Sequence, residues 1–81
     1  MDPNATLSAM LSAYGRAEYE EAREHARDLI GWLDHHGFPP AGHTAASARQ
    51  LAREIKTQSA YALAETTLYH SEPIDHWTQV R

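Results

Sequence analysis

An apolar stripe with the spacing of an α-helix runs through the acidic segment between residues 17 and 36. Apolar side chains recur there every three or four residues, and carboxylates occupy many of the other positions. The stripe consists of Tyr19, Ala22, Ala26, Leu29 and Leu33, with Ile30 beside it, and the carboxylates are Glu18, Glu20, Glu21, Glu24 and Asp28. This pattern is typical of a helix that buries one face against other helices. It therefore favours an all-α fold.

The length of the chain limits it to one modest hydrophobic core. A domain of 81 residues buries roughly 60% of the surface that its unfolded chain exposes. Alanine contributes heavily to the apolar composition, which suits closely packed helices. β-Branched residues never alternate with polar ones over a useful length, which argues against a sheet. We therefore expect residues 1–81 to form a single helical domain.

Capping residues and glycines predict where the first two helices begin and end. The first helix is expected over about 3–14, since Asp2 can cap its N-terminus and Gly15 can take the left-handed conformation that ends many helices. The second is expected over about 17–36, where early carboxylates favour the positive end of the helix dipole and Gly37 follows the last turn.

A third, longer helix is predicted over about 44–69, because helical spacing continues there without an internal proline or glycine. Thr44 or Ser47 can cap this helix, and Ser47 with Gln50 has the spacing of a capping box. After Pro73 the sequence allows a short helix over 73–79 or a frayed tail. The predicted architecture is a small three-helix bundle, a helical hairpin plus a long third helix, with a short C-terminal segment.

The composition suggests a cytoplasmic protein without disulfides. The chain has no cysteine, which excludes a disulfide framework and thiolate metal ligands. No stretch approaches the ~20 apolar residues that span a bilayer, and the N-terminus lacks the pattern of a secretory signal. The acidic net charge of −4 opposes attraction to nucleic acid or to anionic membranes. The excess of acidic residues lies in the first half of the chain.

Sequence signatures of catalysis are absent. There is no G-x-S-x-G, no phosphate-binding glycine loop and no zinc-protease motif. Six histidines invite a metal hypothesis, in which His35, His36 and His43 converge after the second helix. No two of the six are four residues apart along a helix, so this spacing is poor for a metal site. We expect neither an enzyme nor a cofactor.

Large apolar and acidic side chains on the second helix predict a protein interface. Trp32 lies at the edge of the apolar stripe, and large aromatic residues at such edges can anchor partners. We expect Trp32 and Leu33 to be buried on a partner while the acidic face steers a basic surface; the predicted interface residues are Glu20, Glu21, Glu24, Asp28, Trp32 and Leu33. The predicted function is a non-catalytic helical protein-interaction module, a small subunit or regulator of a larger assembly. Its partner is another protein or a second copy, as in a homo-oligomer.

The alternative prediction is a small nucleic-acid-binding regulator. Arg49, Arg53 and Lys56 recur at helical spacing and form a basic edge on the third helix. The run Leu51-Ala52-Arg53-Glu54-Ile55 resembles the first helix of many helix-turn-helix DNA-binding domains, which implies binding of DNA. The next run lacks the glycine usual at the turn of that motif; it reads Lys56-Thr57-Gln58-Ser59-Ala60.

A second short resemblance concerns the predicted hairpin. Gly15 followed by Tyr19-Glu20-Glu21-Ala22 is similar to the joint of a tetratricopeptide-type hairpin, which implies antiparallel first and second helices. Each resemblance covers only a few residues, and neither assigns a family.

Overall fold

The computed structural model describes the backbone of residues 1–71 and the side chains of residues 1–64. Three helices make up this part of the chain: α1 (Pro3–Gly15), α2 (Tyr19–Asp34) and α3 (Ala45–Ser71), with no strand between them. The predicted fold class, a small all-α three-helix bundle, is confirmed. The short helix predicted over 73–79 lies outside the described residues.

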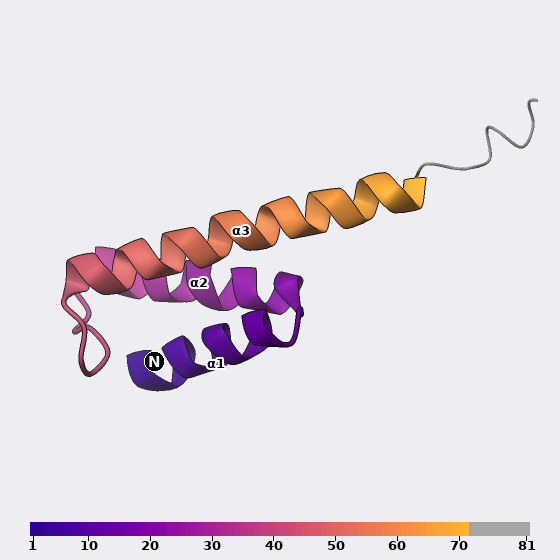
Figure 1. Cartoon of the computed structure of the whole chain (residues 1–81). Helices are drawn as coiled ribbons and strands as arrows, with labels where there is room; N and C mark the ends of the chain where they lie inside the picture. Colours follow the sequence, from indigo (N-terminus) through magenta and orange to yellow (C-terminus); the bar gives the residue numbers. More distant parts are fainter. Residues whose placement is uncertain (72–81) are drawn as a thin grey trace, which may run out of the picture.

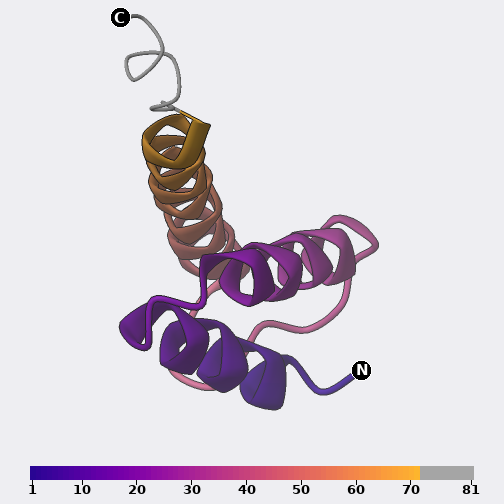
Figure 2. The same ribbon diagram turned by 90° about the vertical axis from the view of Figure 1, so that its right-hand side faces the viewer.

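The second helix lies at the centre of the packing. α1 and α2 form an antiparallel hairpin, and α3 runs back along α2 (Figure 1). α2 packs against both other helices, whereas α1 and α3 touch each other only slightly (Figure 2). α3 has 27 residues and α2 has 16, which correspond to helices about 40 Å and about 24 Å long. The last turns of α3 therefore extend past the end of the hairpin (Figure 1).

The core is built mainly from small side chains of all three helices. Met10 and Leu29 are the largest side chains of this core that are fully buried. The buried hydrophobic residues are Met10, Ala13, Ala22, Ala26, Leu29, Leu33, Ala48, Ala52 and Ile55. Four residues of the predicted stripe on α2, Ala22, Ala26, Leu29 and Leu33, thus lie in the core, whereas Tyr19 is only partly buried. The alanines let neighbouring helices approach closely. Leu11, another apolar residue of α1, is exposed.

Polar side chains at the start of α1 stabilise both that helix and the loop before α3. The Asp2 carboxylate caps α1 by accepting hydrogen bonds from the backbone N–H groups of Asn4, at 3.0 Å, and Ala5, at 3.4 Å. The Asn4 side-chain oxygen accepts a hydrogen bond from the backbone N–H of Ala41, at 2.6 Å. This bond ties the loop between α2 and α3 to the N-terminus of the bundle.

The turn after α1 is a Schellman motif centred on Ala17. The N–H of Glu18 donates to the carbonyl of Ala13 at 2.9 Å, and the N–H of Ala17 donates to the carbonyl of Tyr14 at 3.1 Å. Ala17 has φ 61°, in the left-handed region that favours glycine. The expectation that Gly15 supplies the left-handed residue is wrong, because Gly15 is the last residue of the helix itself.

The turn after α2 repeats this arrangement. The N–H of Gly37 donates to the carbonyl of Trp32 at 2.8 Å, and the N–H of His36 donates to the carbonyl of Leu33 at 3.0 Å. The left-handed residue is His36, at φ 66°, and not the glycine that follows it. Because the turn begins before Gly37, α2 ends two residues earlier than predicted. It also begins two residues later, after the turn at Ala17.

α3 begins with a reciprocal pair of hydrogen bonds. The Thr44 hydroxyl accepts from the backbone N–H of Ser47, and the Ser47 hydroxyl accepts from the backbone N–H of Thr44, both at 3.0 Å. This is the geometry of a capping box with serine in place of the usual glutamate. Thr44 is therefore the capping residue, and the predicted pairing of Ser47 with Gln50 is not the one that forms.

An exposed ion pair bridges the turn between α1 and α2. The Arg16 guanidinium lies 2.8 Å from the Glu18 carboxylate and also donates to the Ser12 hydroxyl. The hydrogen bond and positive charge of Arg16 hold the pKa of Glu18 below its ordinary value. Both side chains are open to solvent, where such a pair contributes little to stability.

Replacing Ala17 with glycine is expected to stabilise the fold, because glycine adopts a positive φ without the steric cost that a Cβ brings. The free energy of unfolding of Ala17→Gly should rise by about 0.5–1 kcal/mol, measured by urea denaturation. Gly42→Ala is the matched control of opposite sign, since Gly42 has φ 83° and alanine there should lower stability. An Ala17→Gly variant that is less stable than wild type would contradict the left-handed conformation assigned to Ala17.

Replacing Ser59 with alanine is also expected to stabilise the fold. The Ser59 side chain is fully buried beside Ile55 on the core face of α3, and its hydroxyl has no hydrogen-bond partner among the described residues. Removing an unpaired buried hydroxyl should raise the free energy of unfolding by about 1 kcal/mol. Ser8→Ala, at an exposed position of α1, controls for helix propensity. Thermal and urea unfolding give the free energy of unfolding of both variants. Equal changes in this free energy for Ser59→Ala and Ser8→Ala would show that burying the Ser59 hydroxyl does not destabilise the fold.

Candidate interaction surfaces

An exposed aromatic side chain is held in place just after α2. The rings of Trp32 and Phe38 pack edge to face, with centroids 5.5 Å apart and planes at 83°. The Trp32 indole N–H donates to the backbone carbonyl of Phe38 at 2.8 Å. Trp32 is partly buried, whereas Phe38 is 62% exposed. Phe38 therefore forms an apolar projection whose position is set by Trp32, and it is not tucked into the core.

Gly37 makes this aromatic pair possible. A Cβ placed on Gly37 would overlap the Trp32 indole, so only glycine lets the ring lie across the backbone between α2 and Phe38. The glycine is needed for close approach and not for its backbone conformation, since its φ is not positive.

Acidic side chains lie along the row of α2 that leads to Trp32. Positions 21, 25, 28 and 32 are four, three and four residues apart, so they share one side of the helix. Glu21 and Asp28 are exposed on this row. His25 lies between them, with its Nε2 atom 3.4 Å from the Glu21 carboxylate. The predicted interface residues Glu21, Asp28 and Trp32 thus share one side of α2.

The structure does not place Leu33 on that surface. Its side chain is 4% exposed and belongs to the core, because position 33 continues the buried stripe of Ala22, Ala26 and Leu29. The predicted role of Leu33 as an interface residue is therefore corrected: contact with a partner would require the bundle to open. Phe38 takes its place beside Trp32 as the apolar part of the surface.

The two other predicted acidic residues lie on a different face of α2. Glu20 and Glu24 are exposed, and they share this face with Arg23 and Arg27, three and four residues away. Gly31 follows one turn after Arg27, and a Cβ there would have no neighbour within 4 Å. The face is thus open at Gly31, whereas Arg23, which is half-buried, and Arg27 lie beside α3.

The predicted basic edge of α3 is divided by its contacts. The Arg49 guanidinium lies 3.1 Å from the Asp34 carboxylate at the end of α2. Arg53 and Lys56 are exposed, and neither forms an ion pair with a described side chain. Only two of the three cations proposed for nucleic-acid binding therefore lack an acidic partner in this part of the chain.

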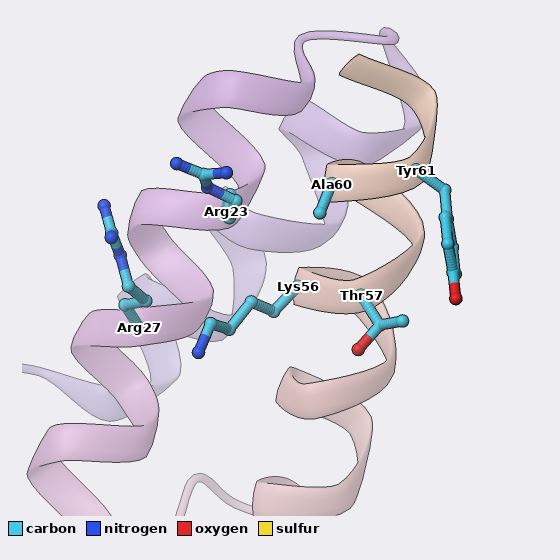
Figure 3. Close-up of a pocket in the computed structure, with 6 residues that line it drawn as sticks. All are labelled: Arg23, Arg27, Lys56, Thr57, Ala60 and Tyr61. Carbon is cyan, nitrogen blue, oxygen red and sulfur yellow. The ribbon is translucent and has the colours of Figure 1, made fainter. Parts of the chain in front are cut away.

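A basic groove lies between α2 and α3. Its volume is about 360 Å³, and it is lined by Arg23, Arg27, Lys56, Thr57, Ala60 and Tyr61. Lys56 extends from α3 toward the turn of α2 that carries Arg27 (Figure 3). Tyr61 is 67% exposed at the α3 side of the groove. Sequence reasoning missed Arg23 and Arg27 here, because only the register of α2 on α3 brings them opposite Lys56.

The histidines after α2 make separate local contacts. His35 Nδ1 lies 2.8 Å from the carbonyl oxygen of Gly31, and His43 Nδ1 lies 3.2 Å from the Ser47 hydroxyl. Within the described residues, no three histidine or carboxylate side chains form a group that could hold a metal ion. The structure thus does not bring His35, His36 and His43 together as a metal centre.

No protein-family model matches this chain, and no curated protein or solved structure matches it significantly. Within residues 1–71, no helix combines the length and the apolar character that a membrane span requires. The two surfaces, the aromatic pair and the basic groove, are therefore interpreted from their own geometry.

Introducing a methyl group at Gly37 is expected to displace the Trp32 ring. Gly37→Ala should lower the free energy of unfolding by about 1–3 kcal/mol, as overpacking does in a tight contact, and should shift Trp32 fluorescence toward that of a solvated indole. Fluorescence is measured in a Trp77→Phe background, which leaves Trp32 as the single tryptophan. Gly31→Ala is the matched control, because a Cβ there meets open space. An unchanged Trp32 spectrum in Gly37→Ala would contradict the packing described.

Proposed function

We propose that this chain is a non-catalytic helical protein-interaction module, a small subunit or regulator of a larger assembly. The exposed Phe38 ring, held by Trp32, is the observation that carries the proposal. A rigid aromatic side chain on a surface offers a partner apolar contact without the entropy cost of ordering it on binding. Trp32 would act by positioning Phe38 and by adding its own exposed edge.

The acidic side chains of α2 define the chemistry of the partner. Asp28 lies one turn before Trp32 on the same side of the helix, and Glu21 lies two turns further back. A partner that fits this surface has an apolar pocket for the aromatic ring and basic residues at its rim. Rim charges of this kind accelerate association and select partners more than they add affinity.

The arrangement of charge favours this function over nucleic-acid binding. Arg49 is paired with Asp34. The exposed Glu20 and Glu24 border Arg23 and Arg27 on α2, so an extended polyanion in the groove would pass close to carboxylates. A salt titration of DNA binding separates the two functions, since nucleic-acid affinity that depends on phosphate contacts falls steeply with salt.

Truncating Phe38 should weaken partner capture without unfolding the chain. Wild type, Phe38→Ala and Leu11→Ala are compared as baits in extracts of the native source, and captured complexes are identified by intact mass. Leu11 is the control, an exposed apolar residue 42% accessible on α1. A partner bound by wild type and by Leu11→Ala should bind Phe38→Ala at least ~10-fold more weakly, as at an interface hot spot.

Melting temperatures of the three baits show whether the fold is retained. A captured protein that binds Phe38→Ala as tightly as it binds wild type would overturn the assignment of this surface.

A further inference from the structure

The groove between α2 and α3 collects the cations of the bundle that have no acidic partner. Among the arginine and lysine side chains that are described, Arg16 and Arg49 each pair with a carboxylate. The others form no ion pair or hydrogen bond with a described side chain; they are Arg23, Arg27, Arg53 and Lys56. Three of these line the groove, and Arg53 lies one turn before Lys56 on the same side of α3. The groove therefore carries an excess of positive charge in a chain whose net charge is −4.

The neighbouring carboxylates do not neutralise this charge. Glu20 and Glu24 are exposed on α2, three residues before each of the two arginines, but neither lines the groove or forms an ion pair with a described side chain. On α3, Glu54 lies two residues before Lys56, which the helical period places on the opposite side of the helix. A groove whose walls carry one sign of charge attracts ligands of the other sign. Its ligand is therefore an anion.

The placement of the cations indicates a phosphate group. Arg23 and Arg27 lie one turn apart on α2, and Lys56 extends from α3 toward the turn that carries Arg27 (Figure 3). The arginine fork matches phosphate oxygens, and lysine adds a point charge. A phosphate monoester carries about −1.5 to −2 charge and three acceptor oxygens, so it suits three cations better than a single carboxylate does. Glu20 and Glu24 disfavour a polyanion that extends along α2.

The other side of the groove is neutral and aromatic. Thr57 and Tyr61 lie on the side of α3 that is turned away from the arginines, and Ala60 lies between them and α2 (Figure 3). The Tyr61 ring is 67% exposed and packs against no other aromatic ring among the described residues. An exposed aromatic ring beside a cationic groove is a platform on which a nucleobase can stack. The groove thus has a charged end and an aromatic end.

We propose that this groove binds a mononucleotide, with its phosphate on Arg23, Arg27 and Lys56 and its base against Tyr61. The ribose would pass over Ala60, whose small side chain leaves room for it. The volume of about 360 Å³ is in the range of small-molecule sites, about 300–1,000 Å³.

This site is separate from the surface assigned above to a partner protein. Arg23 and Trp32 are nine positions apart, which puts them on opposite sides of α2. Ligand binding in the groove can therefore be tested independently of any protein partner, and its failure would leave the assignment of Phe38 unaffected.

The exposure of the groove limits the expected affinity. Arg27, Lys56 and Tyr61 are all exposed, and ionic contacts in water are weak. The dissociation constant for adenosine monophosphate (AMP) is expected at about 1 mM at low salt, and it should rise with ionic strength as the charges are screened. Inorganic phosphate lacks a base to stack and should bind at least ~5-fold more weakly.

Titration of the full chain with AMP, followed by two-dimensional NMR, tests the charged end of the groove. The backbone amide signals of Ala60 and its neighbours should shift and saturate. Arg27→Gln and Lys56→Gln should each raise the dissociation constant at least ~3-fold, because each removes a phosphate contact. Arg16→Gln is the matched control, since it removes the same charge from the turn after α1; it should leave the dissociation constant within about 2-fold of wild type.

Two variants of Tyr61 test the aromatic end. Tyr61→Ala should raise the dissociation constant of AMP at least ~5-fold and leave that of inorganic phosphate within about 2-fold. Tyr61→Phe keeps the ring and should bind AMP within about 2-fold of wild type. Melting temperatures verify that all variants are folded.

Three results would overturn the proposal. The first is the absence of saturable shifts at AMP concentrations up to about 10 mM. The second is an equal loss of affinity in Arg16→Gln and Lys56→Gln, which would reduce the binding to an effect of net charge. The third is tighter binding of a hexaglutamate peptide or a DNA duplex than of AMP to the same residues, which would assign another occupant.

Discussion

The fold depends on the close packing of α2 between its two neighbours. Ala22, Ala26, Leu29 and Leu33 form a buried stripe, and α1 and α3 each rely on it because they barely touch one another. Alanines on this stripe keep the helix axes near, so a modest number of larger side chains, chiefly Met10 and Leu29, suffices to fill the space. The other faces of α2 carry the acidic row of Glu21 and Asp28 and the charged row that includes Arg23 and Arg27.

The two chain reversals around α2 use the same hydrogen-bond pattern with residues that sequence rules do not favour. In both, the left-handed residue has a side chain, Ala17 in one case and His36 in the other. Gly37 is next to such a position and is needed for another reason, the close approach of Trp32. The packing of the helices thus determines the backbone conformation of each turn more strongly than the residue type at the left-handed position does.

Periodicity predicts the helices of this chain well and its surfaces less well. The stripe on α2 is visible in the sequence because burial repeats with the helical period. The same reasoning assigned Leu33 to an interface although it continues that stripe, since adjacency to Trp32 does not reveal which of the two is covered. The basic groove needed the register between α2 and α3, which places Arg23 and Arg27 opposite Lys56. The spacing of residues within either helix does not reveal how the two helices are aligned with each other. The exposure of Phe38 was equally out of reach, because it results from a contact with Trp32 across a turn.

Because α3 is longer than α2, its C-terminal part extends beyond the helix against which it packs. Its last described residue, Ser71, lies about 18 Å along the axis from Ser59, the last fully buried residue among the side chains described, which end at residue 64. A tilt of about 10° between α2 and α3 moves that far end by about 3 Å, given the rigidity of a continuous helix. A small change in the packing angle between α2 and α3 therefore produces a larger displacement at the C-terminal end of α3.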